Sequence, residues 1–209
     1  MNGVELRYGL MNKIAIDIVL LPLDEVTTLT IRENQRLVNN FGSQIAFNVG
    51  KCIPHISLAM GCIKTDDLPA ATKTLDTIAG ETPTLMLVAN GIYVLKAGWS
   101  GIEITNTTEL QSLHEKVMKG LRTFATYDAT PETFIASEDF DPRTPDWMNA
   151  YPDHSFRKFF PHITAGFAQG IDRNSDINFP VRFTASLLAL CQLGSHCTCR
   201  KIVWSKKLK

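Results

Sequence analysis

Hydrophobic residues recur along this chain with two different periods, which separate predicted strands from predicted helices. Residues 14–20 place isoleucine or leucine at every second position, a pattern typical of a strand with one apolar face, and Pro22 ends it. Residues 24–41 have helical spacing, with Asp24 as a suitable N-cap and Gly42 in the position that follows a helix. The first predicted unit is therefore a strand followed by a helix.

The same two periods continue through the rest of the chain and predict an α+β fold. Further strands are expected at 44–49, 53–60, 85–95, 101–105, 160–167, 181–193 and 198–205, and further helices at 66–79 and 107–124. Asn106 with Glu109, or Thr108 with Gln111, resembles a capping box at the start of the last helix. The order of elements repeats between the two halves, except that no good helix follows the strand at 160–167.

One long segment, residues 126–158, follows neither period. It contains spread prolines, acidic residues and aromatic residues, and a stretch of this length is typical of a functional lid or an insertion. The aromatic residues Tyr127, Trp147, Tyr151 and Phe156 either stack on a nucleic-acid base or only hold the insertion against the body. The sequence favours neither role.

A four-residue motif, called a phrase below, occurs twice in the chain, and both copies contain a histidine. The first reads Pro54-His55-Ile56-Ser57 and the second reads Pro161-His162-Ile163-Thr164, with the two histidines 107 positions apart. Alternation along a strand places each histidine on the same face as the hydroxyl residue that follows it, opposite an apolar face. The repeat therefore predicts two equivalent units, each offering one imidazole and one hydroxyl.

Two such units facing each other suit the chemistry of phosphate esters. A neutral imidazole removes a proton from a nucleophile, and a protonated imidazole donates one to a leaving oxygen. A hydroxyl donates a hydrogen bond to an oxygen where negative charge develops. We therefore expect His55 and His162 to be an acid–base pair, with Ser57 and Thr164 as ligands of the phosphate.

A structural role is the more common one for any single His-x-(Ser/Thr) triplet. His196-Cys197-Thr198 fits that triplet as well, but it lacks the flanking proline and isoleucine of the two repeated phrases. The presence of two matching copies in corresponding places of similar halves favours a shared site over two unrelated structural histidines. Asp17, opposite the isoleucine face of its strand, is a further candidate for orienting a histidine.

The two phrases, their spacing and the halved layout resemble the two-histidine phosphoesterase superfamily, which includes RNA ligase-like proteins and cyclic nucleotide phosphodiesterases. The resemblance spans residues 14–208 and is specific only at the two phrases. It implies two lobes related by pseudo-two-fold symmetry, with two antiparallel sheets flanking a central cleft and helices on the outer faces. It also implies metal-independent cleavage of 2′,3′-cyclic phosphates or 2′–5′ phosphodiesters by His55 with Ser57 and His162 with Thr164.

The charge balance and the cysteine content limit the classes of ligand, compartment and metal that we expect for this protein. Lys plus Arg and Asp plus Glu both total 21, and this balance argues against an extended nucleic-acid footprint but allows a small nucleotide or an RNA 3′ end. Five cysteines, an odd number, are read as reduced thiols of a cytoplasmic protein. Cys191, His196, Cys197 and Cys199 lack a second well-spaced ligand pair, so we expect neither a metal nor a cofactor.

The organisation we expect is one bilobal domain over residues 1–209, with 1–12 as an extension and 126–158 as the insertion or lid. The apolar run at 14–23 is too short to span a bilayer and contains Asp17, so no membrane partner is expected. We expect a monomer. Two other functions stay open: a nucleotide-binding module that uses the same cleft without turnover, and a structural or interaction domain in which the phrases are relics.

Overall fold

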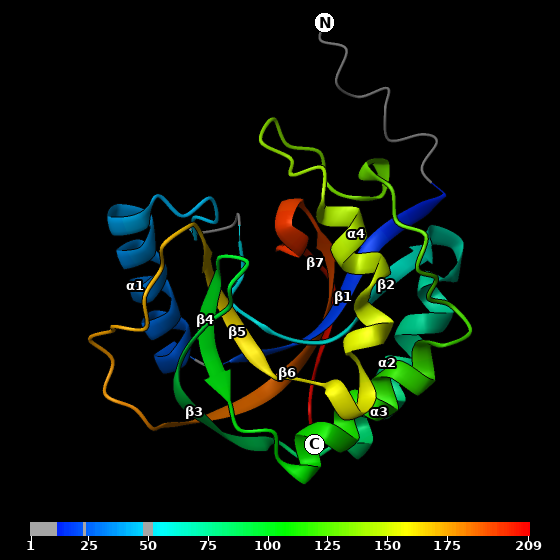
Figure 1. Ribbon diagram of the computed structural model, residues 1–209. Helices are drawn as coiled ribbons and strands as arrows, with labels where there is room; N and C mark the ends of the chain where they lie inside the picture. The colour runs from blue at the N-terminus through cyan, green and yellow to red at the C-terminus, as the bar shows by residue number, and fades with distance from the viewer. Residues whose placement is uncertain (1–11, 23, 48–51) are drawn as a thin grey trace, which may run out of the picture.

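The computed structural model describes residues 12–22, 24–47 and 52–209 (Figure 1). The strands are β1 (Lys13–Pro22), β2 (Ile56–Lys64), β3 (Leu85–Val94), β4 (Trp99–Ile104), β5 (His162–Phe167), β6 (Val181–Leu193) and β7 (Cys199–Lys207). The α-helices are α1 (Asp24–Phe41), α2 (Leu68–Glu81), α3 (Thr108–Leu121) and α4 (Thr144–Asn149). Short 3-10 turns lie at Thr65–Asp67, Pro131–Thr133, Tyr151–His154, Phe156–Lys158 and Ser195–Cys197.

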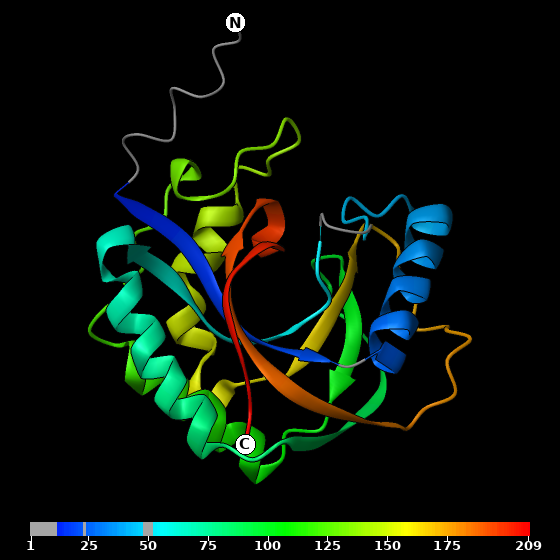
Figure 2. The same cartoon turned by 180° about the vertical axis from the view of Figure 1, so that it is seen from behind.

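All seven strands are antiparallel to their neighbours and form one hydrogen-bonded sheet in the order β2-β1-β6-β3-β4-β5, with β7 also paired to β6. The long strand β6 joins two arms of the sheet. One arm is β3-β4-β5, and β3 pairs with residues 181–185 of β6; the other arm is β2-β1 with β7, and β7 pairs with residues 187–193 (Figure 2). The predicted α+β class is confirmed. The two separate sheets that we expected are instead two arms of one sheet, because β6 is long enough to belong to both.

The two histidine phrases lie at opposite ends of this sheet order. β2 carries the first and β5 carries the second, and each pairs with a single neighbouring strand within the sheet. The sheet curves strongly enough that β2 and β5 contact each other (Figure 1). Curvature of the sheet therefore brings together two edges that are far apart in the hydrogen-bonding order.

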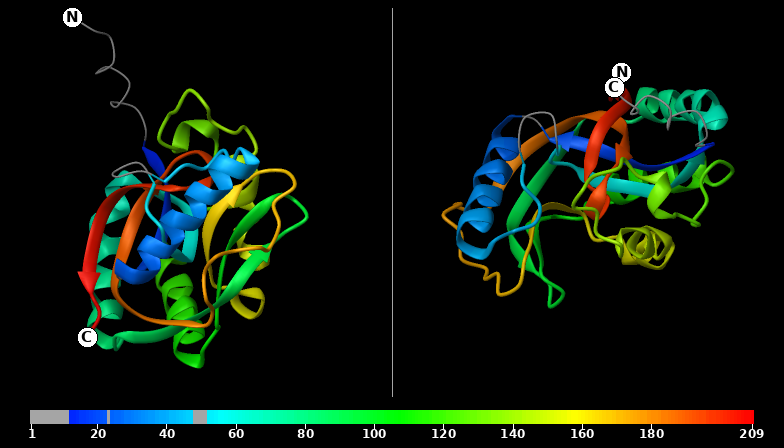
Figure 3. Two further views of the ribbon diagram at one scale, coloured as in Figure 1. Left: turned by 90° about the vertical axis from the view of Figure 1, so that its left-hand side faces the viewer. Right: turned by 90° about the horizontal axis from the view of Figure 1, so that it is seen from above.

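The helices cross between the halves. α1 follows β1 in sequence but packs against β5, whereas α3 follows β4 but packs against β2 and α2. Figures 1 and 3 show α1 on one side of the molecule and α2 with α3 on the other. Each histidine strand is consequently covered on its outer face by a helix from the other half of the chain.

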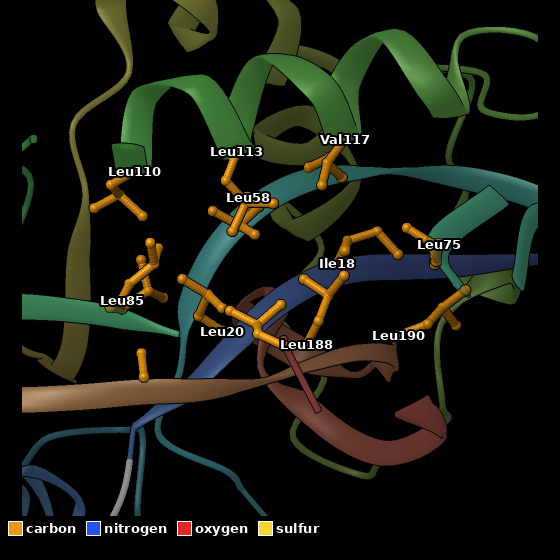
Figure 4. Close-up of a cluster of buried hydrophobic side chains, with 14 of the residues drawn as sticks. Ile18, Leu20, Leu58, Leu75, Leu85, Leu110, Leu113, Val117, Leu188 and Leu190 are labelled. Carbon is orange, nitrogen blue, oxygen red and sulfur yellow. The ribbon is translucent and has the colours of Figure 1, made fainter. Parts of the chain in front are cut away.

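A continuous apolar core lies between the β1, β2 and β6 arm and the α2–α3 layer (Figure 4). Leu58 of β2 is fully buried there against the α3 stripe that includes Leu113 and Val117. Burying one such side chain stabilises the fold by about 1.5–3 kcal/mol. Ile56 and Leu58 therefore anchor the start of β2 in the core, which leaves Ser57, between them, on the opposite face.

Some predicted elements differ from the structure. Residues 44–47 do not form a strand, and 48–49 fall outside the described residues, as does the expected extension apart from Asn12. α3 begins after Thr107, whose hydroxyl accepts a hydrogen bond from the Leu110 N–H, so neither predicted capping box is correct. No helix follows β5, as expected, because residues 168–179 form turns and irregular backbone.

The irregular segment 126–158 is packed against the body. It contains the unpredicted helix α4 and three of the 3-10 turns. Phe134, Met148 and Tyr151 are buried in it. Among the residues that the structure describes, every helix is too short or too polar to serve as a membrane span.

Candidate active site

Both predicted histidines are held in the same way by their own backbone. The Nδ1 atom of His55 lies 2.6 Å from the carbonyl oxygen of Ile53, and Nδ1 of His162 lies 2.7 Å from that of Phe160. In each unit the hydrogen bond reaches back two residues across the intervening proline. If Nδ1 carries the proton, the other ring nitrogen, Nε2, has a free lone pair and is the reacting atom. The repeated Pro-His phrase thus encodes a fixed ring orientation.

The structure brings these two histidines together. β2 and β5 are in contact, with His55 at the residue preceding β2 and His162 at the first residue of β5. Burial, together with a smaller effect of the nearby His162, lowers the pKa of His55 to about 4. Burial also lowers the pKa of His162. Both rings are therefore neutral at pH 7 when no ligand is bound.

Asp17 lies directly beside the first histidine. Ser57 Oγ donates a hydrogen bond of 2.6 Å to Asp17 Oδ2, and the same carboxyl oxygen lies 3.6 Å from His55 Nε2. The side chain of Asp17 is fully buried, and burial raises its pKa well above the usual range despite the hydrogen bond from Ser57. The sequence named Asp17 only as a candidate for orienting a histidine, and its contact with Ser57 depends on the β1–β2 register.

The second histidine has an aromatic environment instead. The ring of Tyr93 meets His162 edge-on at 5.0 Å between centroids, and the Phe160 ring stacks on it at 5.4 Å. Burial raises the pKa of the Tyr93 phenol, and the interaction of the phenol with the Thr164 side chain opposes this rise. A Cβ at Gly101 would lie 2.7 Å from a Tyr93 ring carbon, so the close approach requires glycine there.

A buried polar side chain from a helix holds each histidine strand in place. Asn34 of α1 donates to the carbonyl of Ala165 at 2.6 Å, and His114 of α3 hydrogen-bonds the carbonyl of Leu58 through Nδ1 at 2.7 Å. In both strands the acceptor lies three residues after the catalytic candidate. His114 is fully buried. Asn34 was not identified from the sequence as a buried residue that holds β5, because a polar side chain on a helix gives no sign of burial.

The aromatic residues of the 126–158 segment mainly hold that segment to the body. Trp147 of α4 packs edge-on against Trp99 of β4 with ring centroids 5.0 Å apart, and Tyr151 is buried. Phe156 is exposed and packs against His114. The packing contacts of Trp147 and Tyr151 favour the second of the two roles that the sequence left open.

Comparison with known proteins finds no sequence relative but clear structural ones. No protein-family model matches the sequence, and no curated protein matches it. The solved structure of TT0787 of Thermus thermophilus matches with a TM-score of 0.63 at 12% identity, covering 93% of this chain and 98% of that one. E. coli LigT complexed with 3′-AMP matches with a TM-score of 0.56 at 13% identity, covering 94% and 99%.

A third solved structure has the same fold. The MHV ns2 PDE domain matches with a TM-score of 0.51 at 15% identity, covering 86% of this chain and 99% of that one. Each likeness extends over nearly the whole of both chains, so it concerns the complete fold and not one motif. At these identities the comparisons establish a shared architecture, and the chemistry must be argued from this chain's own residues.

Proposed function

We propose that this chain, which has the two-histidine phosphoesterase fold of those structures, is a phosphodiesterase that cleaves a 2′,3′-cyclic phosphate or a 2′–5′ phosphodiester at a nucleotide or RNA end. One observation carries the proposal. His55 and His162 come from opposite ends of the sheet, their Nδ1 atoms are held by backbone carbonyls, and their strands contact each other. E. coli LigT was crystallised with 3′-AMP and with ATP, which supports a small nucleotide as the ligand.

The proposed reaction needs one proton acceptor and one proton donor. The Nε2 atom of one neutral histidine takes a proton from water or from a ribose hydroxyl as that oxygen attacks phosphorus. The Nε2–H of the other, protonated histidine gives its proton to the leaving oxygen as the P–O bond breaks. Each such transfer contributes a rate factor of about 10²–10⁴. Reversing the reaction exchanges the two roles, so each histidine serves both.

The substrate itself supplies the conditions for the protonated state. In the free protein burial lowers the pKa of His55 to about 4 and also lowers that of His162. A phosphodiester anion between the rings favours their charged form and raises both pKa values. Binding of the anion is therefore coupled to uptake of a proton, and the proton taken up is the one that the acid donates.

Ser57 and Thr164 are proposed to hold the non-bridging phosphate oxygens. Ser57 has one hydroxyl proton, which it donates to Asp17 at 2.6 Å. Because burial raises the pKa of Asp17, that carboxyl is readily protonated and can donate to Ser57 Oγ instead. The Ser57 proton is then available for the phosphate. Asp17 thus acts as a positioning residue for Ser57.

The test is an assay of 2′,3′-cyclic nucleotides and 2′–5′ dinucleotides in the presence of EDTA. We expect turnover that survives EDTA and that falls at least about 100-fold in His55→Ala and in His162→Ala. His154→Ala is the matched control, because His154 is an exposed histidine in the Tyr151–His154 turn. Nucleotide binding without turnover would support the non-catalytic binding module, and neither binding nor turnover would overturn both.

A further inference from the structure

Three side chains with metal-binding atoms meet beside the first histidine. Asp17, His55 and Cys199 each offer one ligand atom, and these atoms all lie within 4.8 Å of one another. They come from β1, from the residue before β2, and from the first residue of β7. The Ile53 N–H donates to the Cys199 carbonyl at 3.1 Å, so the segment entering His55 is tied directly to β7.

We propose that Asp17, His55 and Cys199 form a site for a zinc-like divalent cation that occupies His55 Nε2 and thereby inhibits the enzyme. The inhibitory effect rests on the proposed function, whereas binding of the cation does not. A carboxylate, an imidazole and a thiolate are the ligand types that zinc prefers, and three protein ligands leave a fourth position for water. The cation would occupy His55 Nε2, the nitrogen that exchanges a proton with the substrate in the proposed reaction.

The geometry is close to what a tetrahedral ion needs. Zinc bonds of about 2.0–2.3 Å place pairs of ligand atoms roughly 3.3–3.7 Å apart. His55 Nε2 and Asp17 Oδ2 are 3.6 Å apart. The sulfur atom of Cys199 would have to approach by at most about 1 Å from the observed separations to complete the set. The hydrogen bond from His55 Nδ1 to the Ile53 carbonyl already directs Nε2 as the ligand atom.

A second observation points independently to a ligand at this place. Asp17 is fully buried, and its Oδ1 atom accepts no hydrogen bond from the residues that the structure describes. The nearby Ala59 N–H lowers the pKa of the carboxyl, but burial, which raises this pKa, has the larger effect. An unpaired buried acceptor costs about 1–3 kcal/mol, and a cation that Asp17 holds through Oδ1, or through both carboxyl oxygens, would remove that cost.

The protons balance when the ion binds. Burial raises the pKa values of the Cys199 thiol and of the Asp17 carboxyl, so both groups release their protons to solvent as the ion enters. His55 binds as the neutral ring that it already is at pH 7. No redox step is involved.

The site differs from the zinc set considered in the sequence. His196 lies elsewhere, with its Nε2 atom 3.4 Å from Asp141 Oδ2. Cys191 is a buried thiol beside Cys199, and the two thiols interact, but Cys191 is not a member of the ligand triangle. Cys191→Ala is therefore a matched control for Cys199→Ala.

Cobalt(II) provides a direct test of binding, because a thiolate ligand gives it a charge-transfer absorption band. We expect one equivalent of Co²⁺ to produce this band in the full chain and in Cys191→Ala, and added Zn²⁺ to remove it. The band should be lost in Cys199→Ala, in the closer isostere Cys199→Ser and in His55→Ala, with circular dichroism confirming that each variant is folded. Absence of the band from the wild type, or its persistence in both Cys199 variants, would overturn the proposal.

Turnover provides the second readout. Zn²⁺ should inhibit the wild type and Cys191→Ala equally, EDTA should restore activity, and Cys199→Ser should need at least tenfold more Zn²⁺ for half inhibition. Equal sensitivity of Cys199→Ser and the wild type would overturn the inhibitory role. If no substrate is turned over, the phosphodiesterase proposal fails while the cobalt titration still decides the metal site.

Discussion

The two histidine units share their framework but differ in what surrounds it. In both, a ring nitrogen bonds the carbonyl two residues earlier, at Ile53 and at Phe160. In both, a helix side chain bonds the carbonyl three residues after the histidine. The repeated phrase in the sequence is therefore a repeated geometry, imposed by the proline before each histidine and the covering helix outside each strand.

The surroundings of the two rings are built by residues far away in sequence. His55 has a buried carboxyl at 3.6 Å and a thiol close by, whereas His162 packs in a cluster with the aromatic rings of Tyr93 and Phe160. The polar, sulfur-containing environment offers donors to a cation, and the aromatic one does not. Local sequence thus sets ring orientation, while tertiary neighbours set the protonation and ligand preferences that distinguish the two rings.

The sharpest way to test the equivalence of the units is to remove both rings together. Each single variant, His55→Ala or His162→Ala, should reduce kcat by about 10²–10⁴. Because acid and base act in one concerted unit, the double variant should be little worse than the more damaged single variant. Single-turnover rates on a 2′,3′-cyclic nucleotide provide the measurement. Fully multiplicative losses would show that the rings act in separate steps.

Acid should weaken the fold through the histidines, and most strongly through His55. The unfolded ring takes up a proton near pH 6.5, whereas the folded His55 does so only at a pKa of about 4. The unfolded state therefore binds more protons between these values, and the free energy of unfolding falls as the pH is lowered through this window. The fall attributable to His55 is about 3 kcal/mol.

Urea unfolding at pH 7 and at pH 4.5 measures this effect. His55→Gln should lose most of its share of the pH dependence, because the amide does not titrate. His154→Gln, at an exposed site, serves as the control and should retain the wild-type dependence. An unchanged dependence in His55→Gln would show that His55 titrates normally in the folded protein.

The helix contacts allow the shared framework to be broken on one side at a time. Asn34→Ala removes the bonds to the Ile45 and Ala165 carbonyls and from the Phe47 N–H, whereas His114→Ala removes those to Leu58 and Phe156. Each variant should lose about 1–3 kcal/mol or more of unfolding free energy, because buried carbonyls are left unpaired. Asn34→Ala should lose more, since it leaves more groups without partners.

Denaturant unfolding measures both variants, and phosphodiesterase activity adds a second readout. Loosening of β5 or β2 should lower kcat more than it raises KM, because ring placement matters most in the transition state. A loss of stability with unchanged kcat in both variants would assign Asn34 and His114 a purely structural role.

Local patterns were sufficient to predict the seven strands, the helices α1, α2 and α3, and the placement of His55 and His162 in corresponding units. The polar residue Asn34 could not be recognised as buried, because a helix position shows its burial only when its covering strand is known. The six-residue helix α4 lies among prolines and is too short for a periodic signal. The monomeric state and the cytoplasmic location stay predictions.

The joining of the two sheet arms through β6 also could not be predicted from the sequence. Alternation predicts a strand at 181–193, but it does not say that residues 181–185 pair with β3 while 187–193 pair with β7. The same limitation applies to Asp17. Its alternation was visible, but its bond to Ser57 follows from the β1–β2 register, which shifts between Ile18 and Val19.

The smallest effect on activity is expected from replacing Asp17, the buried carboxyl that distinguishes the first histidine unit from the second. Asp17→Asn keeps an oxygen that can accept from Ser57, but it removes the cost of ionising a buried carboxyl. The folded carboxyl has a raised pKa, so wild-type stability falls as the pH rises above the unfolded value of about 3.9. The variant should therefore gain in melting temperature relative to the wild type, and the gain should grow between pH 5 and pH 8.

Activity of Asp17→Asn should fall by less than about tenfold, because one hydroxyl contact of about 1 kcal/mol is weakened and both histidines remain. Asp17→Ala is the matched comparison, since it also removes the acceptor for Ser57 and should lose both stability and activity. A melting temperature of Asp17→Asn that drops below the wild type with increasing pH would show that the carboxylate is ionised and stabilised in the fold. In that case His55 would carry the compensating charge, and the two histidines would differ in protonation before any substrate binds.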